Sequence, residues 1–295
     1  MAERPLRVAT RNSALALAQA GSVAEMLGGA ELVEVDSDGE AGDKERFVRG
    51  VERALLEGEA EVGVHSAKDV PSAIPEGLSI AAVPIREHPG DDWIGVGSSL
   101  DEVPEGARVG TSSLRRRSQL LATRPDLRIT DLHGNVDTRL RRLSEGALDA
   151  IVLARAGLRR LNREDEVAFA IPIDRMTPAA GQGTLVVQTR SDDSRAAGVV
   201  AAIGDERSLR ELTAERATVA VLGASCATPL GVHARATGDR IEIEAFVGLP
   251  DGSDWIRDRV ALEAEQPAVV GALLAERLLG AGARDILDRA EETAG

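Results

Sequence analysis

The chain has few of the features that mark secreted or membrane-bound proteins. One cysteine, Cys226, occurs in 295 residues, so an internal disulfide cannot form, which is typical of a reducing compartment. No apolar run approaches membrane-spanning length, and residues 1–8 lack the apolar core of a secretory signal. These absences predict a cytoplasmic protein that does not bind membranes.

Lysine is almost missing, with only Lys44 and Lys68, so arginine carries nearly all the positive charge. Arginine binds carboxylates through two parallel hydrogen bonds, although nucleotide composition alone could also produce this bias. The net charge of −14 argues against nucleic acid as a partner. Arginines nevertheless cluster at 115–117 and at 139, 141 and 142, which predicts local anion binding.

The length, with 43% hydrophobic and 28% charged residues, predicts a globular protein of two or three domains. Strand and helix patterns alternate through the first two thirds of the chain, which predicts mostly parallel α/β sheets. Residues 109–113 (Val-Gly-Thr-Ser-Ser) echo residues 8–13 (Val-Ala-Thr-Arg-Asn-Ser), so two similar, doubly wound lobes are expected.

Two segments with proline or glycine, 84–89 and 177–183, are interpreted as paired crossings between the lobes that form a hinge. Residues 184–189 are then expected to return to the first sheet. Strands followed by helices predict a small α+β domain at the end of the chain. The expected domains are lobe 1 (1–85 and 184–203), lobe 2 (89–178) and a C-terminal domain (206–295).

Within these domains the pattern predicts particular elements. The helix after Ser13 should bury Leu15, Ala18, Val23, Met26 and Leu27. The other expected helices are 44–56, one ending near 123, 136–144, one starting near 206, 266–279 and 284–290. The expected strands are 6–9, 31–35, one before Lys68, 78–83, one within 107–113 that runs into a hydroxyl-rich turn, 127–132, 148–153, 231–237, 240–247 and 255–262.

Two polar turns stand out. Val62 and Val64 form a short apolar strand that ends in Lys68-Asp69, and Pro71 prevents a helix there, so both charges are expected at the carboxyl end of a strand, where α/β sheets bind ligands. A solvated loop is the alternative. Thr111-Ser112-Ser113 with Arg115 and Arg116 predicts an anion site at a helix start, or else a capped helix with solvated arginines.

His65-Ser66-Ala67-Lys68-Asp69-Val70-Pro71 resembles the signature of the hydroxymethylbilane synthase family, also called porphobilinogen deaminase. Other segments resemble family motifs in the same order along nearly the whole chain: Ala9-Thr-Arg11 with Ser13, Phe47-Val48, Gly110–Arg116, Gly134-Asn-Val136 with Thr138-Arg139, Ala156–Leu158 with Arg160, Ala180–Gly183 and Thr213–Arg216. The resemblance implies two lobes of periplasmic-binding-protein type and a small C-terminal domain.

It also implies an activity: the stepwise condensation of four porphobilinogen molecules, with loss of ammonia, followed by hydrolytic release of hydroxymethylbilane for haem biosynthesis. The family builds this product on a dipyrromethane cofactor held by a cysteine thioether. Cys226, in the small-residue loop Gly223–Gly231, matches that cysteine, although Ala224-Ser225 departs from the family's usual glycine-containing sequence. From residue type alone, a lone cysteine is more often a buried apolar residue.

The resemblance implies roles for further residues. Asp69 would be the catalytic carboxylate. Besides Cys226, the expected cofactor-binding residues are Ser13, Ser66, Lys68, Thr111, Ser112, Ser113, Arg115, Arg116 and Gly134. The expected substrate-binding residues are Arg11, Gln19, Lys44, His133, Arg139, Arg155 and Arg160. The four histidines are scattered without ligand spacing, so no metal is expected, and a monomer is expected.

His133 departs from the family, which usually has arginine before Gly-Asn. Imidazole offers fewer donors than guanidinium, so anion binding there should be weaker. Arg155, expected at the end of a strand where the family has a small apolar residue, is hypothesised to supply the missing charge. A surface ion pair is the alternative for Arg155.

Two other classes of function remain open at this stage. One is a two-lobed anion-binding protein without catalysis, which would not need Cys226. The other is the ligand-sensing module of a regulator, although no helix-turn-helix candidate is visible.

Overall fold

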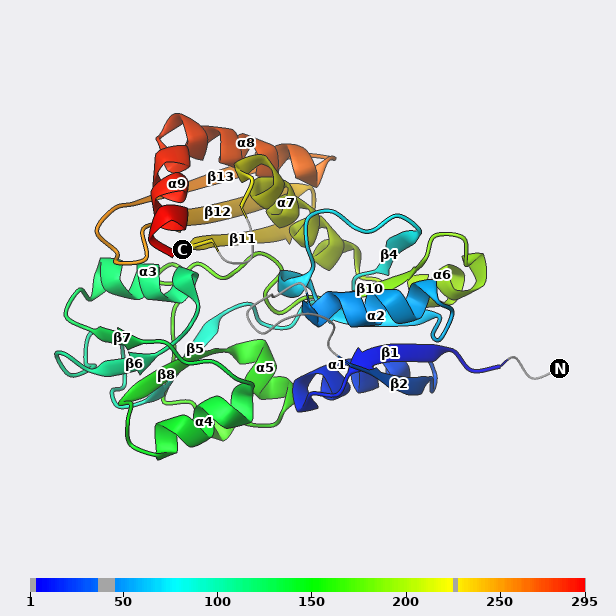
Figure 1. Cartoon of the computed structure of the whole chain (residues 1–295). Helices are drawn as coiled ribbons and strands as arrows, with labels where there is room; N and C mark the ends of the chain where they lie inside the picture. Colours follow the sequence, from blue (N-terminus) through cyan, green and yellow to red (C-terminus); the bar gives the residue numbers. More distant parts are fainter. Residues whose placement is uncertain (1–3, 37–45, 225–227, 295) are drawn as a thin grey trace. The chain divides into compact units, whose positions relative to one another are not determined.

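The computed structural model describes residues 4–36, 46–224 and 228–294 (Figure 1). By their contacts the residues form two compact units, Met1–Glu87 with Thr184–Arg210, and His88–Gly183 with Glu211–Gly295. Lys44, most of the 36–44 loop and Cys226 lie outside the described residues, so the predictions about them stay predictions. The three-domain division also stays a prediction.

Unit 1 is built on a five-stranded sheet with the order β2-β1-β3-β10-β4. Its strands are β1 (Arg7–Arg11), β2 (Glu31–Val35), β3 (Val62–Ser66), β4 (Leu78–Ala82) and β10 (Leu185–Arg190), and its helices include α1 (Ala14–Met26), α2 (Arg46–Leu56) and α6 (Ser194–Ala201). The expected return of the chain to the first sheet is confirmed. β10 begins opposite Ser66, where β3 ends, and therefore runs antiparallel to β3, so the sheet is more mixed than predicted.

Unit 2 contains a second five-stranded sheet with the equivalent order β7-β6-β8-β5-β9. Its strands are β5 (Asp91–Gly95), β6 (Arg108–Gly110), β7 (Arg128–Thr130), β8 (Ala150–Ala154) and β9 (Phe169–Ala170), with helices α3 (Leu114–Thr123), α4 (Val136–Ser144) and α5 (Arg155–Arg160). β5, which arrives from unit 1, runs antiparallel to β8 and takes the place that β10 has in the first sheet. The prediction of two similar α/β lobes is therefore confirmed.

The chain crosses between the two sheets twice, after β4 and again before β10, as the segments 84–89 and 177–183 predicted. The two crossings contact each other, because the Gln182 Nε2 group donates to the Pro89 carbonyl oxygen at 2.6 Å. This contact places residues distant in sequence side by side next to β5.

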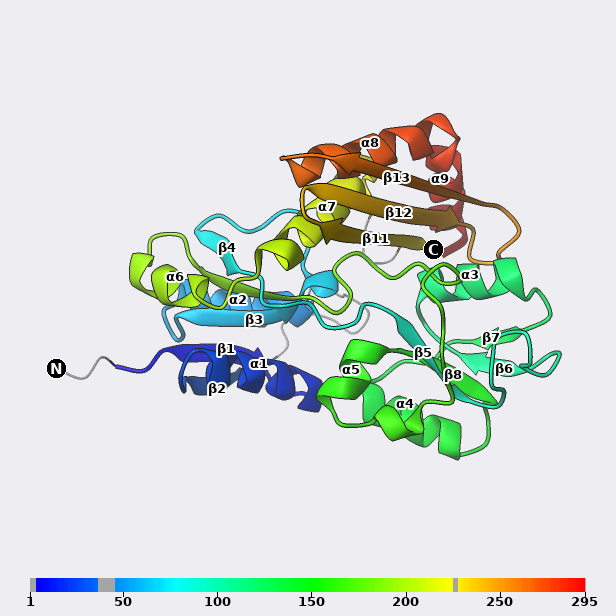
Figure 2. The same cartoon turned by 180° about the vertical axis from the view of Figure 1, so that it is seen from behind.

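The C-terminal part of unit 2 is an antiparallel sheet of β11 (Leu230–Thr237), β12 (Arg240–Gly248) and β13 (Trp255–Glu263). Side chains alternate along β12: Ile241, Ile243 and Ala245 join the core beneath α7 (Glu206–Leu222), α8 (Pro267–Gly280) and α9 (Ala283–Ala294), which Figures 1 and 2 show beside this sheet. These elements agree with the predicted strands and helices to within a few residues.

The opposite face of the C-terminal sheet packs on α3. Gly248 and Gly252 allow this approach, since a Cβ atom at Gly252 would lie 2.4 Å from the Ala122 nitrogen and one at Gly248 would lie 2.6 Å from Ser118 Oγ. Arg257 completes the contact by stacking 5.5 Å from the Phe246 ring centroid and donating to Gln119 Oε1. The C-terminal sheet and the second lobe therefore share one packed interface.

The buried face of α1 differs from the prediction. α1 buries Ala16, Gln19, Ala20, Val23 and Ala24, and Met26 is 51% exposed. Of the predicted residues, Val23 is buried and Leu27 packs against the core, whereas the rest of the buried face consists of alanines and Gln19, whose small or polar side chains the apolar pattern did not mark. For α2, Val48, Val51 and Leu55 are buried as predicted.

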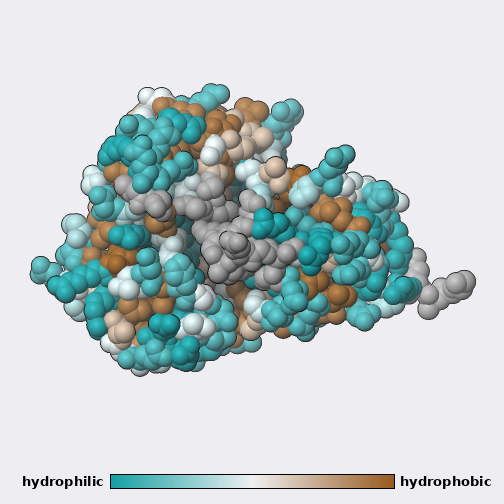
Figure 3. All heavy atoms as spheres, viewed as in Figure 1, coloured by the Kyte–Doolittle hydropathy of each residue, from teal (hydrophilic) through white to brown (hydrophobic). Residues whose placement is uncertain are grey.

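The visible surface is mainly hydrophilic, with separate apolar patches, as is usual for folded chains (Figure 3). No helix in the described part of the chain is both long and apolar enough to span a membrane.

Candidate functional site

In unit 1 the segment after β3 forms the Lys-Asp turn, Ser66–Asp69. A single 3-10 turn (Ala67–Asp69) follows the strand, the Ala67 N–H donates to the Thr184 carbonyl at 2.9 Å, and the Val70 N–H donates to the Ala67 carbonyl. Asp69 is half-buried, and among the described residues its carboxylate has no hydrogen-bond or ion-pair partner. The turn therefore fixes the backbone and leaves this carboxylate available to a ligand.

Other predicted residues gather at the same edge of the sheet. β1 and β3 are parallel, so Arg11, at the end of β1, lies at the edge where Ser66 ends β3. Gln19, buried on α1, donates to Ser66 Oγ at 2.9 Å, and Ser13 caps α1 by accepting from the Ala16 N–H at 3.3 Å. The predicted helix cap is confirmed, and the carboxyl ends of β1 and β3 bring these polar groups together.

His65 precedes this turn and points into the protein. Burial, with a smaller contribution from the nearby Arg11 cation, lowers the pKa of His65 to about 4, although a hydrogen bond with Gln188 acts in the opposite direction. His65 is therefore neutral at physiological pH and belongs to the interior of the sheet.

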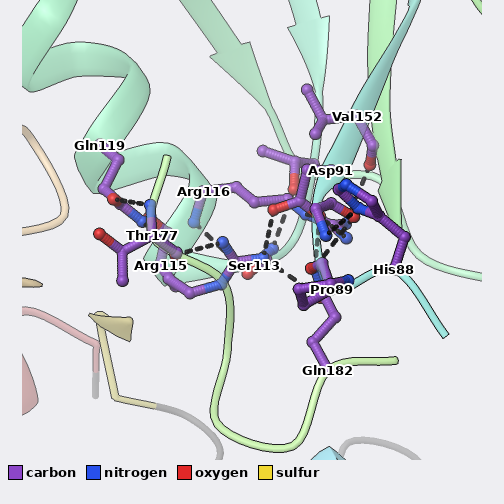
Figure 4. A network of polar contacts seen from close by, with 12 residues as sticks. His88, Pro89, Asp91, Ser113, Arg115, Arg116, Gln119, Val152, Thr177 and Gln182 are labelled. Carbon is purple, nitrogen blue, oxygen red and sulfur yellow. Dashed lines mark hydrogen bonds and ion pairs between the residues drawn. The ribbon is translucent and has the colours of Figure 1, made fainter. Parts of the chain in front are cut away.

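In unit 2 two arginines of α3 converge on one carboxylate (Figure 4). Arg115 Nη2 lies 2.8 Å from Asp91 Oδ2, and Arg116 Nη2 lies 2.8 Å from Asp91 Oδ1. Both guanidinium groups are buried, with Arg115 4% and Arg116 5% exposed, which excludes the alternative of solvated arginines. Asp91, Arg115, Arg116 and Arg139 are called the arginine cluster below.

The charges of the arginine cluster do not balance. Burial by itself raises the pKa of Asp91, but the Arg115 and Arg116 cations outweigh it and lower that pKa to about 2. Burial, and secondly the Arg116 cation, lower the pKa of Arg139 to about 10. Two buried cations thus share one anion, and the half-buried Arg139 adds a third positive charge near Arg116. Such an excess is stabilised by a further anion. A ligand with several carboxylates, such as a dipyrromethane, fits this cluster.

The hydroxyl-rich turn before α3 supports the arginines. Ser113 is the N-cap of α3 and accepts from the Arg116 N–H at 3.5 Å, while its own N–H donates to Thr111 Oγ1 at 3.2 Å. Thr111 is buried and Ser112 is half-buried. The turn follows β6, at the carboxyl end of that strand.

A second turn leads into α4. Asn135 caps this helix, and Gly134 has a φ of +112°, with the position of its missing Cβ only 2.8 Å from Thr138 Cγ2. Arg139 Nε donates to the Gly134 carbonyl at 2.8 Å, and His133 is exposed. Only glycine fits this turn, which orients Arg139.

Arg155 directly follows the end of β8, where it was expected, and is the first residue of α5. Its Nη2 atom lies 2.6 Å from Asp92 Oδ1, and its Nη1 atom lies 3.3 Å from His88 Nε2. These contacts favour the ion-pair alternative, although the pair is largely buried rather than superficial. On the same helix, Arg160 Nη2 donates to the Gly183 carbonyl at 2.8 Å.

The sequence did not indicate Asp91 or Gln182 as site residues, nor Asp92 as the ion-pair partner of Arg155. Asp91 and Asp92 lie on β5, which was not predicted, because two adjacent acidic residues are unusual on a buried strand. The signal that could have found them is the short apolar run Trp93-Ile94, which follows them directly. No group of three or more potential metal ligands occurs among the described residues.

Comparison with known proteins agrees with these observations. Residues 6–198 match the family model described as "Porphobilinogen deaminase, dipyromethane cofactor binding domain", and residues 209–280 match "Porphobilinogen deaminase, C-terminal domain". A porphobilinogen deaminase of Syntrophus aciditrophicus is 41% identical over 303 residues, covering 97% of this chain and 99% of the relative.

A second relative and one solved structure are also similar to this chain. A porphobilinogen deaminase of Campylobacter concisus is 46% identical over 256 residues, covering 86% of this chain and 82% of the relative. A TRAP periplasmic solute binding protein from Desulfovibrio salexigens superimposes with a TM-score of 0.41 at 11% identity, covering 70% of this chain and 74% of that chain.

Proposed function

This chain belongs to the porphobilinogen deaminase family, and from that premise we propose how its residues carry out the reaction. It is a transferase of porphyrin biosynthesis with a dipyrromethane cofactor. It condenses four porphobilinogen molecules head to tail, releases ammonia at each step and finally releases hydroxymethylbilane by hydrolysis. The observation that carries the residue assignment is the excess of buried positive charge in the arginine cluster.

The cofactor would be attached to Cys226 and held through its carboxylates by Arg115, Arg116 and Arg139. When bound, the dipyrromethane supplies the pyrrole ring to which the first porphobilinogen is joined. Ser13, Ser66, Lys68, Thr111, Ser112, Ser113 and the backbone of Gly134 would add further hydrogen bonds. Arg155 and Arg160, with Arg11, Gln19, His133 and Lys44, would bind incoming substrate.

Asp69 is assigned the chemistry. Each addition breaks the C–N bond of porphobilinogen, releases ammonia, forms a C–C bond to a pyrrole ring and removes a proton from that ring. An ionised carboxylate stabilises the cationic methylene pyrrole that forms when ammonia leaves, and it can then take the ring proton. The Asp69 carboxylate suits both tasks because no side chain among the described residues forms a hydrogen bond or an ion pair with it.

The acidic protein would bind its acidic substrate through local charge. Porphobilinogen carries an acetate and a propionate, so the growing chain is polyanionic, and the buried arginines attract it despite the net charge of −14. We further propose a cytoplasmic monomer without nucleic-acid or membrane partners. The acidic composition and the single cysteine support this proposal.

Two measurements test the function. The mass of the denatured wild-type protein should exceed the chain mass by one dipyrromethane, and the purified protein should convert porphobilinogen to hydroxymethylbilane. An unmodified chain without turnover would contradict the proposal and favour anion binding without catalysis.

The hypothesis that Arg155 compensates for His133 has its own test. If Arg155 binds substrate, Arg155→Ala should raise the KM for porphobilinogen, and Asp92→Asn, which keeps the arginine, should not. An unchanged KM for Arg155→Ala would leave Arg155 only its ion pair with Asp92.

A further inference from the structure

Within the arginine cluster, Arg115 and Arg116 converge on Asp91. A carboxylate at this place would by itself oppose the binding of anions. The Asp91 side chain is buried. It accepts hydrogen bonds from Arg116 Nε at 3.1 Å and from Gln182 Nε2 at 3.0 Å, in addition to its ion pairs with both arginines. The three donor residues come from α3 and from the second crossing segment (Figure 4). A buried carboxylate with three partner residues holds those residues in fixed positions.

Asp91 fixes the orientation of both guanidinium groups together with two backbone carbonyls. Arg116 Nη1 donates to the Val152 carbonyl at 2.9 Å, and Arg115 Nη1 donates to the Thr177 carbonyl at 2.8 Å. Each guanidinium group is thus bound by Asp91 and by one backbone carbonyl, and these two contacts fix the orientation of its plane. Guanidinium has five N–H donors, so each arginine retains donors beyond the protein acceptors found among the described residues.

The carboxylate also makes it possible to bury two like charges next to each other. Burial lowers the pKa of Arg115, and the Arg116 cation lowers it too, whereas Asp91 raises it. Asp91 cancels only one of the two positive charges, so the pair remains attractive to an anion.

We propose that Asp91 is a positioning residue that holds Arg115 and Arg116 side by side to receive the carboxylates of the dipyrromethane and of the growing chain. This inference rests on the proposed function. Asp91 would not contact the reacting atoms and would act through the two arginines alone.

Asp91→Asn tests this role because asparagine keeps the shape and one acceptor oxygen but lacks the charge. The fraction of purified protein that carries the dipyrromethane, determined from the mass spectrum of the denatured chain, should fall severalfold below the wild-type fraction. Asp92→Asn is the matched control, because it removes a neighbouring buried charge that pairs with Arg155 instead, and it should keep its cofactor.

A double-mutant cycle separates positioning from general destabilisation. If Asp91 acts through Arg115 and Arg116, then Asp91→Asn should cost less cofactor in an Arg115→Gln background than in the wild-type background, because one of the two arginines that it positions is already gone. Fully additive losses would overturn the proposal. Should Asp91→Asn not fold, Asp91→Glu, which retains the charge but displaces it by one methylene, should fold and still lose cofactor.

The controls distinguish the two possible failures. Wild-type protein without cofactor would contradict the proposed function itself. Wild-type and Asp92→Asn proteins with cofactor, together with full occupancy in Asp91→Asn, would overturn the role of Asp91 and leave the function intact.

Discussion

The Lys-Asp turn of unit 1 and the arginine cluster of unit 2 use carboxylates in opposite ways. Asp69 is half-buried and has no partner among the described residues, whereas Asp91 is buried and joined to two arginines and a glutamine. A carboxylate with no protein partner can respond to charge that appears during a reaction. One held by two guanidinium groups is fixed, and what it contributes is the placement of its partners.

This difference supports the proposed roles, chemistry for the Lys-Asp turn and ligand binding for the arginine cluster. Substitution at Asp69 should therefore change rates with little effect on stability, and substitution in the arginine cluster should change stability and ligand binding together.

The largest expected effect is on turnover. Asp69→Asn should lower kcat by about 10²–10⁴-fold, the range for a group that transfers a proton in the transition state. Because Asp69 has no described partner, the variant should keep its cofactor and its melting temperature. A steady-state assay and a mass measurement on the same preparation check both, and wild-type turnover would remove Asp69 from the mechanism.

A substitution in the arginine cluster, by contrast, should lower the stability of the protein. Arg116→Ala leaves Asp91 with part of its charge unpaired in the interior, and removing one partner of a buried ion pair costs about 3–5 kcal/mol. Urea denaturation measures this loss. Arg108→Ala, in the exposed pair with Asp149, is the control and should cost about 0–1 kcal/mol. Equal losses for the two variants would contradict the special role of the buried cluster.

The two units should also differ in their response to acid. The pKa of His65 is about 4 in the folded protein, below its ordinary 6.5, so the unfolded chain binds the extra proton and stability falls as the pH drops from about 6.5 to 4. The pKa of Asp91 is about 2 rather than 3.8, so its contribution is present above pH 3.8 and is lost as the pH falls towards 2.

At 1.36 kcal/mol per pKa unit, His65 should account for about 3 kcal/mol and Asp91 for about 2 kcal/mol. Urea unfolding at a series of pH values checks this, with His65→Gln expected to flatten the curve between pH 6.5 and 4 only. A wild-type slope in that variant would show that His65 does not titrate as described.

The smallest expected effect concerns the helix N-caps, a feature that the two lobes share. Ser13 caps α1, which follows β1, and Ser113 caps α3, which follows β6, the strand that holds the equivalent place in the second sheet. Ser13→Ala and Ser113→Ala should each cost about 1 kcal/mol of stability. Thermal unfolding measures both, and a much larger loss for Ser113→Ala would indicate that its turn also supports the arginine cluster.

The local pattern predicted most regular elements, including the bounds of α4 and the turn at Asp69, because apolar periodicity and caps act over a few residues. It was only partly right for α1, which buries the predicted Val23 but otherwise alanines and Gln19, because close approach to the sheet depends on small size rather than apolarity. It also missed β5, since no local pattern marks Asp91 and Asp92 as buried.

The sequence by itself determined the alternation of strands and helices, the two lobes, the family and the residue types of the site. The tertiary structure alone decided which charges are paired. Asp91 on β5, Arg116 on α3 and Gln182 on the second crossing are far apart in sequence, and only the crossing of the chain between two sheets brings them within hydrogen-bond distance. Pairing depends on distance and burial in space, which the order of residues along the chain does not encode locally.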